Sequence, residues 1–143
     1  MVGTEALKDA FPQMPVGQEF QGLFETSVEK NDRFAMLIIH FDNFDKTLKQ
    51  LGEDITSVVM VRLARIIHGL SKTCPMRWGR LDQERFACFC PDMDEAAAVQ
   101  LSREIQGRLA LVGEETVSVG VAVYPFWPFE NSSTFFVISV LHA

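Results

Sequence analysis

The pattern of apolar and polar positions predicts a chain in which helices and strands alternate. Apolar residues recur at helical spacing in residues 18–30, 54–71 and 94–111, as in helices that bury one face. A continuous apolar run at residues 34–41 predicts a strand that is buried on both faces. A β-branched run at residues 116–124 predicts another strand. These segments predict an α/β core.

Breaks in the pattern predict the connections. Prolines and a glycine within residues 1–17 predict an irregular lead-in. Gly52 predicts the end of a short helix over residues 44–51. Two apolar runs around a polar tip predict a β-hairpin over residues 77–90. Its tip, residues 82–85, lacks glycine, although tight hairpin turns favour residues that accept positive φ.

The order of these elements predicts the fold class. Helix, strand, helix, helix, hairpin, helix and strand follow one another along the chain. Hairpins give antiparallel neighbours, and helical crossovers join parallel strands. The sequence therefore predicts an α/β fold with a mixed central sheet flanked by helices.

Composition and charge exclude several classes of function. The 143 residues predict a single domain, 1–143, and 48% of them are apolar. The net charge of −6 argues against a nucleic-acid partner, which would need clustered Lys and Arg. No apolar run approaches the ~20 residues that cross a bilayer, so no membrane partner is expected. Three cysteines, Cys74, Cys88 and Cys90, are typical of a reducing compartment, so we expect a cytoplasmic protein.

Four segments, in order, resemble the GGDEF domain of diguanylate cyclases over about residues 9–125. Residues 9–20 resemble the motif D-x-L-T-G-L-x-N-R-R-x-F, and residues 37–44 resemble L-D-x-D-x-F. Residues 80–86 lie where R-x-G-G-D-E-F would lie, and residues 117–125 resemble V-T-x-S-x-G-x-A-x-Y-P. The resemblance implies a nucleotidyl-cyclase palm, in which two protomers each present one GTP and join the two into cyclic di-GMP.

The metal site that the resemblance implies is incomplete. Family members bind Mg²⁺ with carboxylates from the end of the central strand and from the third residue of the tip. His40 stands at the first of these positions, and neutral imidazole is a poor ligand for Mg²⁺. Asp42 and Glu84 keep their carboxylates. We interpret Asp42 and Glu84, with His40, as the remnant of a metal site.

The nucleotide site departs from the family as well. Asp82 and Gln83 replace the two glycines that let the backbone approach a nucleotide closely. Leu48 and Ser57 stand where the family reads the guanine edge, and neither can replace the lost Asn and Asp. The positions left as a remnant nucleotide site are Asp82, Gln83, Glu84 and Lys46.

These departures favour a catalytically inactive, degenerate GGDEF domain of bacterial cyclic di-GMP signalling, with no catalytic set intact. It would be a regulatory or protein-interaction module with a protein partner or as a homodimer. No cofactor is expected, except Mg²⁺ if nucleotide binding is retained. The first alternative is a receptor that binds GTP through Glu84, Asp42 and Lys46. The second is an enzyme: a residual diguanylate cyclase, or one of altered specificity with a transition metal at His40 and Glu84.

Two further groups of residues could have either a structural role or a functional one. The three cysteines are interpreted as core residues rather than as a thiolate metal site, because no fourth ligand lies at suitable spacing. Residues 126–143 diverge from the family and are rich in aromatic residues. They would form either a cover for the core or an interface.

Overall fold

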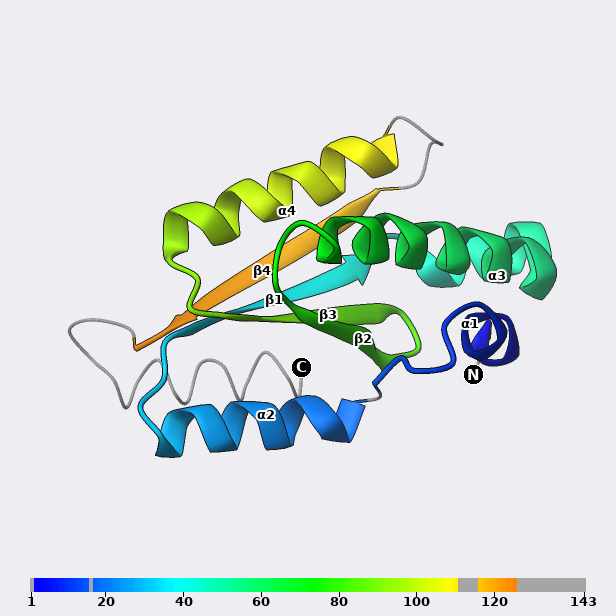
Figure 1. Ribbon diagram of the computed structural model, residues 1–143. Helices are drawn as coiled ribbons and strands as arrows, with labels where there is room; N and C mark the ends of the chain where they lie inside the picture. Colours follow the sequence, from blue (N-terminus) through cyan, green and yellow to red (C-terminus); the bar gives the residue numbers. More distant parts are fainter. Residues whose placement is uncertain (1, 16, 111–115, 126–143) are drawn as a thin grey trace.

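The computed structural model describes residues 2–15, 17–110 and 116–125, in which helices pack on both faces of a sheet (Figure 1). The described strands form one sheet in the order β2-β3-β1-β4. In chain order the elements are α1 (Thr4–Ala10), α2 (Gly17–Glu29), β1 (Phe34–Phe41), α3 (Phe44–Ser71), β2 (Arg77–Asp82), β3 (Arg85–Pro91), α4 (Glu95–Ala110) and β4 (Val117–Tyr124).

The strands and the principal helices follow the sequence pattern closely. The continuous apolar run is β1, and seven of its eight residues are buried. The predicted hairpin is β2 and β3, which pair antiparallel from Arg77↔Phe89 to Asp82↔Arg85. The predicted α/β fold with flanking helices is confirmed.

The prediction of a mixed sheet is wrong for the described strands. β1 pairs antiparallel with both β3 and β4, and β2 pairs antiparallel with β3. The helical crossovers do join parallel strands, because α3 connects β1 to β2 and α4 connects β3 to β4. A third strand lies between the members of each parallel pair, so no two parallel strands are neighbours.

The prediction of an irregular lead-in over residues 1–17 is also wrong, because α1 occupies Thr4–Ala10. Its Leu7 is fully buried in the core, and α1 packs beside α3 (Figure 1). The prolines Pro12 and Pro15 lie after α1, so they end the helix rather than prevent it. A helix of seven residues is weakly stable by itself, and we attribute its formation to the burial of Leu7 against the rest of the protein.

The predicted break falls at Gly52, where two helical segments of α3 meet at a kink. Its φ of 86° and ψ of 173° are not helical, so the predicted break lies where the glycine is. The predicted apolar stripe is only partly buried. Leu63 and Ile67 lie in the core, whereas Ile55 and Val58 are 50% and 56% exposed. The face of α3 just after the kink therefore leaves apolar side chains at the surface.

The core has two layers, one on each face of the sheet. One layer contains Leu37 and Cys88, with residues of α3 and α4, and the other contains Met36 and Phe89, with Phe20 and Phe24 of α2. Cys88 and Cys90 are both buried on the first face, as predicted for core cysteines. Within the described part of the chain, no helix is long and apolar enough to cross a membrane.

Candidate nucleotide and metal site

The end of β1 lies between the hairpin tip and the start of β4. The backbone N–H of Phe41 donates to the carbonyl of Glu84 (2.9 Å), and that of Asp42 donates to the carbonyl of Thr116 (3.0 Å). His40 is paired with Arg85 on one side and with Ser118 on the other. This backbone register brings together His40, Asp42 and Glu84, the three residues that the sequence interpretation assigned to one remnant site.

The imidazole of His40 lies between the two carboxylates. Its Nε2 is 3.1 Å from Oε1 of Glu84, and its Nδ1 is 3.9 Å from Oδ1 of Asp42. The distance between His40 and Glu84 is that of a close polar contact between an imidazole and a carboxylate. The His40 and Glu84 side chains are 41% and 38% exposed, so the pair lies at the surface.

Asp42 is held by two hydroxyl groups from the start of β4. Thr116 Oγ1 donates to Oδ2 (2.8 Å), and Ser118 Oγ donates to Oδ1 (2.7 Å). Sequence reasoning missed both hydroxyls. Their spacing could have indicated this, because residues two apart on a strand, such as Thr116 and Ser118, face the same side of the sheet. Each Asp42 oxygen therefore already accepts a hydrogen bond.

These residues do not fit a Mg²⁺ site. Mg²⁺ requires near-octahedral oxygen ligands at close range. His40 presents nitrogen and contacts Glu84, and Asp42 accepts hydrogen bonds from Thr116 and Ser118. Among the residues that the structure describes, no group of three or more His, Cys, Asp or Glu side chains is arranged to hold a metal ion.

Asp82 stabilises the hairpin tip in the absence of glycine. Its carboxylate accepts a hydrogen bond from Arg85 Nε at 2.7 Å, and its other oxygen accepts from the backbone N–H of Glu84 at 3.2 Å. A short Asp side chain that bonds to the backbone two residues on is a common way to hold a turn. The charge of Asp82 is therefore paired with Arg85 within the tip.

Arg80 connects the tip to α1. The residue is 4% exposed, and its guanidinium donates to the carbonyls of Asp82 (3.1 Å) and Gln83 (2.6 Å). Nη1 also lies 3.5 Å from the hydroxyl of Thr4 on α1. Burial lowers the pKa of Arg80, and the nearby charge of Asp82 opposes that shift. Sequence reasoning did not assign Arg80 a role, although it opens the tip motif.

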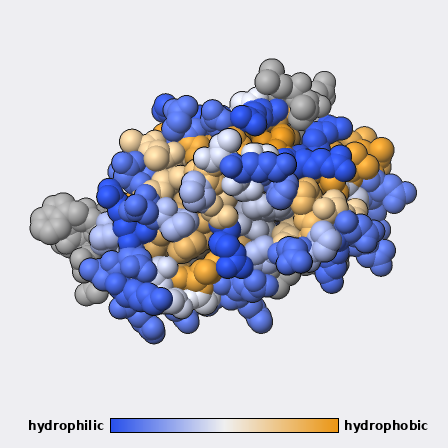
Figure 2. Space-filling view, viewed as in Figure 1, coloured by the Kyte–Doolittle hydropathy of each residue, from blue (hydrophilic) through white to orange (hydrophobic). Residues whose placement is uncertain are grey.

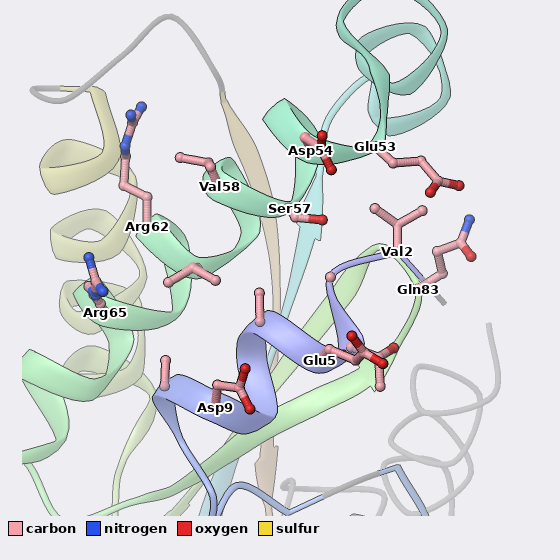
Figure 3. Close-up of a pocket in the computed structure, with 15 residues that line it drawn as sticks. Val2, Glu5, Asp9, Glu53, Asp54, Ser57, Val58, Arg62, Arg65 and Gln83 are labelled. Carbon is pink, nitrogen blue, oxygen red and sulfur yellow. The ribbon is translucent and has the colours of Figure 1, made fainter.

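A pocket of about 1410 Å³ lies between α1, the part of α3 after the kink and the tip (Figure 3). Ser57 and Gln83 both line it, so it includes one guanine-reading position and one tip position. Glu5 and Asp9 line it from α1, and Arg62 lies on α3. Lys46, which the sequence interpretation placed in the remnant nucleotide site, is exposed and does not line this pocket.

The family model for "Diguanylate cyclase, GGDEF domain" matches residues 15–132. The chain belongs to the GGDEF family. No curated protein matches the sequence. The family resemblance stated from the four segments is confirmed, and the GGDEF cyclases of this family use Mg²⁺.

Solved GGDEF structures share this fold. The GGDEF domain of DgcB from Caulobacter crescentus, solved with cyclic di-GMP, is 16% identical at a TM-score of 0.73, covering 90% of this chain and 81% of that one. The active GGEEF domain of a diguanylate cyclase from Vibrio cholerae is 18% identical at 0.68, with coverages of 84% and 80%. The diguanylate cyclase SiaD from Pseudomonas aeruginosa, solved with its activator SiaC, is 16% identical at 0.71, with coverages of 90% and 54%.

Proposed function

We propose that this GGDEF domain does not make cyclic di-GMP and acts as a regulatory or protein-interaction module in cyclic di-GMP signalling. The observation that carries the proposal is the 3.1 Å contact between His40 Nε2 and Glu84 Oε1. An imidazole stands at the first metal-ligand position of the family, and it contacts Glu84, the carboxylate at the second position. A carboxylate pair that would attract Mg²⁺ is thereby replaced by a histidine in close contact with a glutamate.

Loss of the metal removes the main source of catalysis for this chemistry. Joining two nucleoside triphosphates requires a divalent cation to neutralise phosphate charge and to help activate a ribose hydroxyl. Most of the transition-state stabilisation is electrostatic, and His40 cannot supply the charge of a divalent ion. The tip carboxylate of Asp82 adds negative charge where the family has glycine, although Arg85 pairs with it.

The guanine end of the site supports the same proposal. Leu48 packs against the core and offers no hydrogen bond to a base. Ser57 lines the pocket beside α1 and offers a hydroxyl where the family has a carboxylate. A site that lacks polar partners for a base loses selectivity for it. Both ends of the nucleotide groove therefore argue against efficient use of GTP.

A role in protein interaction is supported by the surface of α3. Leu51, Ile55 and Val58 are each at least half exposed, and exposed apolar residues at helical spacing suit a protein contact. Apolar surface is visible where Figure 1 places the first turns of α3 (Figure 2). We propose that residues 1–143 form a single domain in the bacterial cytoplasm. This domain would bind a protein partner or a second copy of the chain.

A second function, binding GTP without turnover, is supported by the pocket beside Ser57 and Gln83. Its volume of about 1410 Å³ is sufficient for a nucleotide. Mg²⁺ would then accompany the nucleotide rather than belong to the protein. Glu5, Asp9 and Glu53 also line the pocket, and their charges oppose a triphosphate, so we place this function second.

One experiment separates these functions. Purified protein is titrated with GTP in the presence of Mg²⁺ and then of Mn²⁺ by calorimetry, and the same samples are analysed for cyclic di-GMP. A family cyclase with an intact tip motif is the positive control. No product is expected. Saturable binding without product would favour the receptor, and formation of cyclic di-GMP would refute the proposal.

A further inference from the structure

A second pocket, which we call the aromatic pocket, lies between the α1–α2 connection, the later turns of α3 and the start of β2. Its volume is about 680 Å³. Three of its lining residues bring their rings together. The ring of Phe11 lies 5.2 Å from that of His68 and 5.1 Å from that of Trp78, and His68 lies 5.8 Å from Trp78. The pocket thus has one wall made of aromatic rings from three separate segments.

The backbone fixes the α1–α2 connection beside this wall. Gly79 of β2 lies so close to the connection that a Cβ there would be 2.3 Å from the carbonyl oxygen of Pro15. Trp78, the preceding residue, is 8% exposed and belongs to the core. The close approach of Gly79 to Pro15 and the burial of Trp78 therefore fix the shape of this wall. Small-molecule sites usually have such a preformed shape.

The charge around the aromatic pocket is positive. Arg65 of α3 and Arg77 of β2 line it, and none of the lining residues that the structure describes is Asp or Glu. This contrasts with a chain whose net charge is −6. One acidic group faces it from α2, because Glu19 Oε2 lies 3.7 Å from Arg77 Nη2. Both side chains of that pair are more than half exposed, and such pairs are weak.

The proposed regulatory function leaves this pocket unused. Its lining includes no residue of the tip and no residue from the end of β1, where His40 and Asp42 lie. Arg65 is its one charged residue that also lines the larger pocket between α1 and α3. Arg65 and Arg77 are both exposed, so their charges are not required for packing of the core. They are therefore available to a ligand.

We propose that the aromatic pocket binds a small organic anion with a planar aromatic body. The ring of the ligand packs against Phe11 and His68, the two rings of the wall that are not buried, where aromatic pairs gain stabilisation beyond the area that they bury. Its carboxylate or phosphate pairs with Arg65 and Arg77, whose planar guanidinium groups suit bidentate hydrogen bonds to such anions. An aromatic carboxylate and a nucleoside monophosphate share this chemistry.

Calorimetry with three probes tests the proposal on the full chain. The probes are indole-3-acetate, guanosine 5′-monophosphate and uncharged indole. We expect saturable binding of at least one anion, about tenfold tighter than binding of indole, because the charge-assisted contact supplies much of the affinity. Binding of indole-3-acetate alone would identify an aromatic carboxylate, and binding of guanosine 5′-monophosphate alone would identify a nucleotide.

Four variant proteins assign the binding to this pocket. The double variant Arg65→Gln, Arg77→Gln is expected to weaken anion binding about tenfold or more, while its thermal unfolding stays unchanged because both side chains are exposed. Arg77→Gln alone is also expected to weaken binding, and it distinguishes the two pockets because Arg77 lines only the aromatic pocket whereas Arg65 lines both. Glu19→Gln is expected to tighten binding roughly twofold to fivefold by removing the competing carboxylate. Arg103→Gln is the matched control, since Arg103 is an exposed arginine on α4 outside the pocket.

Three results would overturn the proposal. The first is that neither anion binds saturably at millimolar concentration. The second is that indole binds as tightly as the anions. The third is that the double variant binds like the parent, which would place the anion elsewhere, for instance in the groove beside Ser57.

Discussion

His40 Nε2 lies 3.1 Å from Glu84 Oε1, joining the end of β1 to the tip of the neighbouring hairpin. In the family pattern the two positions hold carboxylates that share a metal ion. Here one carboxylate is replaced by an imidazole that contacts the other. Glu84 therefore has a polar side-chain neighbour where the family has a second carboxylate.

Restoring the carboxylate should restore affinity for a divalent ion. In His40→Asp the imidazole is lost, and the introduced carboxylate and Glu84 present oxygen ligands at adjacent positions. We expect Mn²⁺ to bind about tenfold more tightly than to the parent in calorimetry. His40→Ala, which removes the imidazole without adding a ligand, is the control. Equal Mn²⁺ affinity in the parent and in His40→Asp would contradict this interpretation of the pair.

Arg80 should be important for stability. Replacing it with Met removes the donors to the carbonyls of Asp82 and Gln83 in a buried setting. We expect a loss of about 2 kcal/mol in the free energy of unfolding, measured by urea denaturation, because buried acceptors lose their partners. Arg103→Met, at an exposed position on α4, should change the free energy little. A loss no larger than that of the control would show that the tip does not need Arg80.

Stability should fall at alkaline pH because of the buried thiols. Burial raises the pKa of the Cys90 thiol from 9.0 to about 12, and Cys74 adds to the rise. Between those pH values the unfolded chain has lost the proton that the folded chain keeps. The folded state then binds more protons, so the free energy of unfolding falls as pH rises, by up to about 1.4 kcal/mol per pH unit for one thiol.

The check is urea denaturation at pH 8 and at pH 10.5 of the parent and of Cys90→Ala. The variant should be less stable at pH 8, because a buried side chain is truncated, but its stability should depend less on pH. Parallel pH dependence in the two proteins would show that Cys90 does not contribute to the loss.

The apolar stripe of α3 offers a test of the observed packing. Ile55 is half exposed and Leu63 is fully buried, although the sequence pattern treats them alike. Ile55→Gln should change the free energy of unfolding by less than about 0.5 kcal/mol. Leu63→Ala should lower it by about 2–5 kcal/mol. Similar losses in the two variants would mean that the kinked part of α3 is packed differently.

The sequence predicted most of the fold because most of its signals are local. The eight-residue run of β1 and the glycine kink at Gly52 lie where the pattern places them. The pairing of strands is not local. The pattern could show that crossovers join parallel strands, but not that β1 lies between β3 and β4. Likewise, α1 forms because Leu7 is buried against distant residues, and no local pattern reports that.

For the candidate site, the sequence could name residues but not the contacts that they make. Family positions identified His40, Asp42 and Glu84, and the strand register brings them together. The hydroxyls of Thr116 and Ser118 lie more than 70 residues along the chain from Asp42, so only the folded sheet shows that they hold it. Lys46 was also assigned to the nucleotide site from the sequence, and it does not line the pocket beside Ser57. The predictions for residues 126–143 lie outside the described residues.

The most direct test of the central claim is product analysis after incubation of the purified protein with GTP and either Mg²⁺ or Mn²⁺. We expect no cyclic di-GMP, because the metal-ligand pair is replaced by the contact between His40 and Glu84. Formation of cyclic di-GMP at a rate above that of a Glu84→Gln variant prepared in parallel would contradict the claim, since it would show that Glu84 still supports the chemistry.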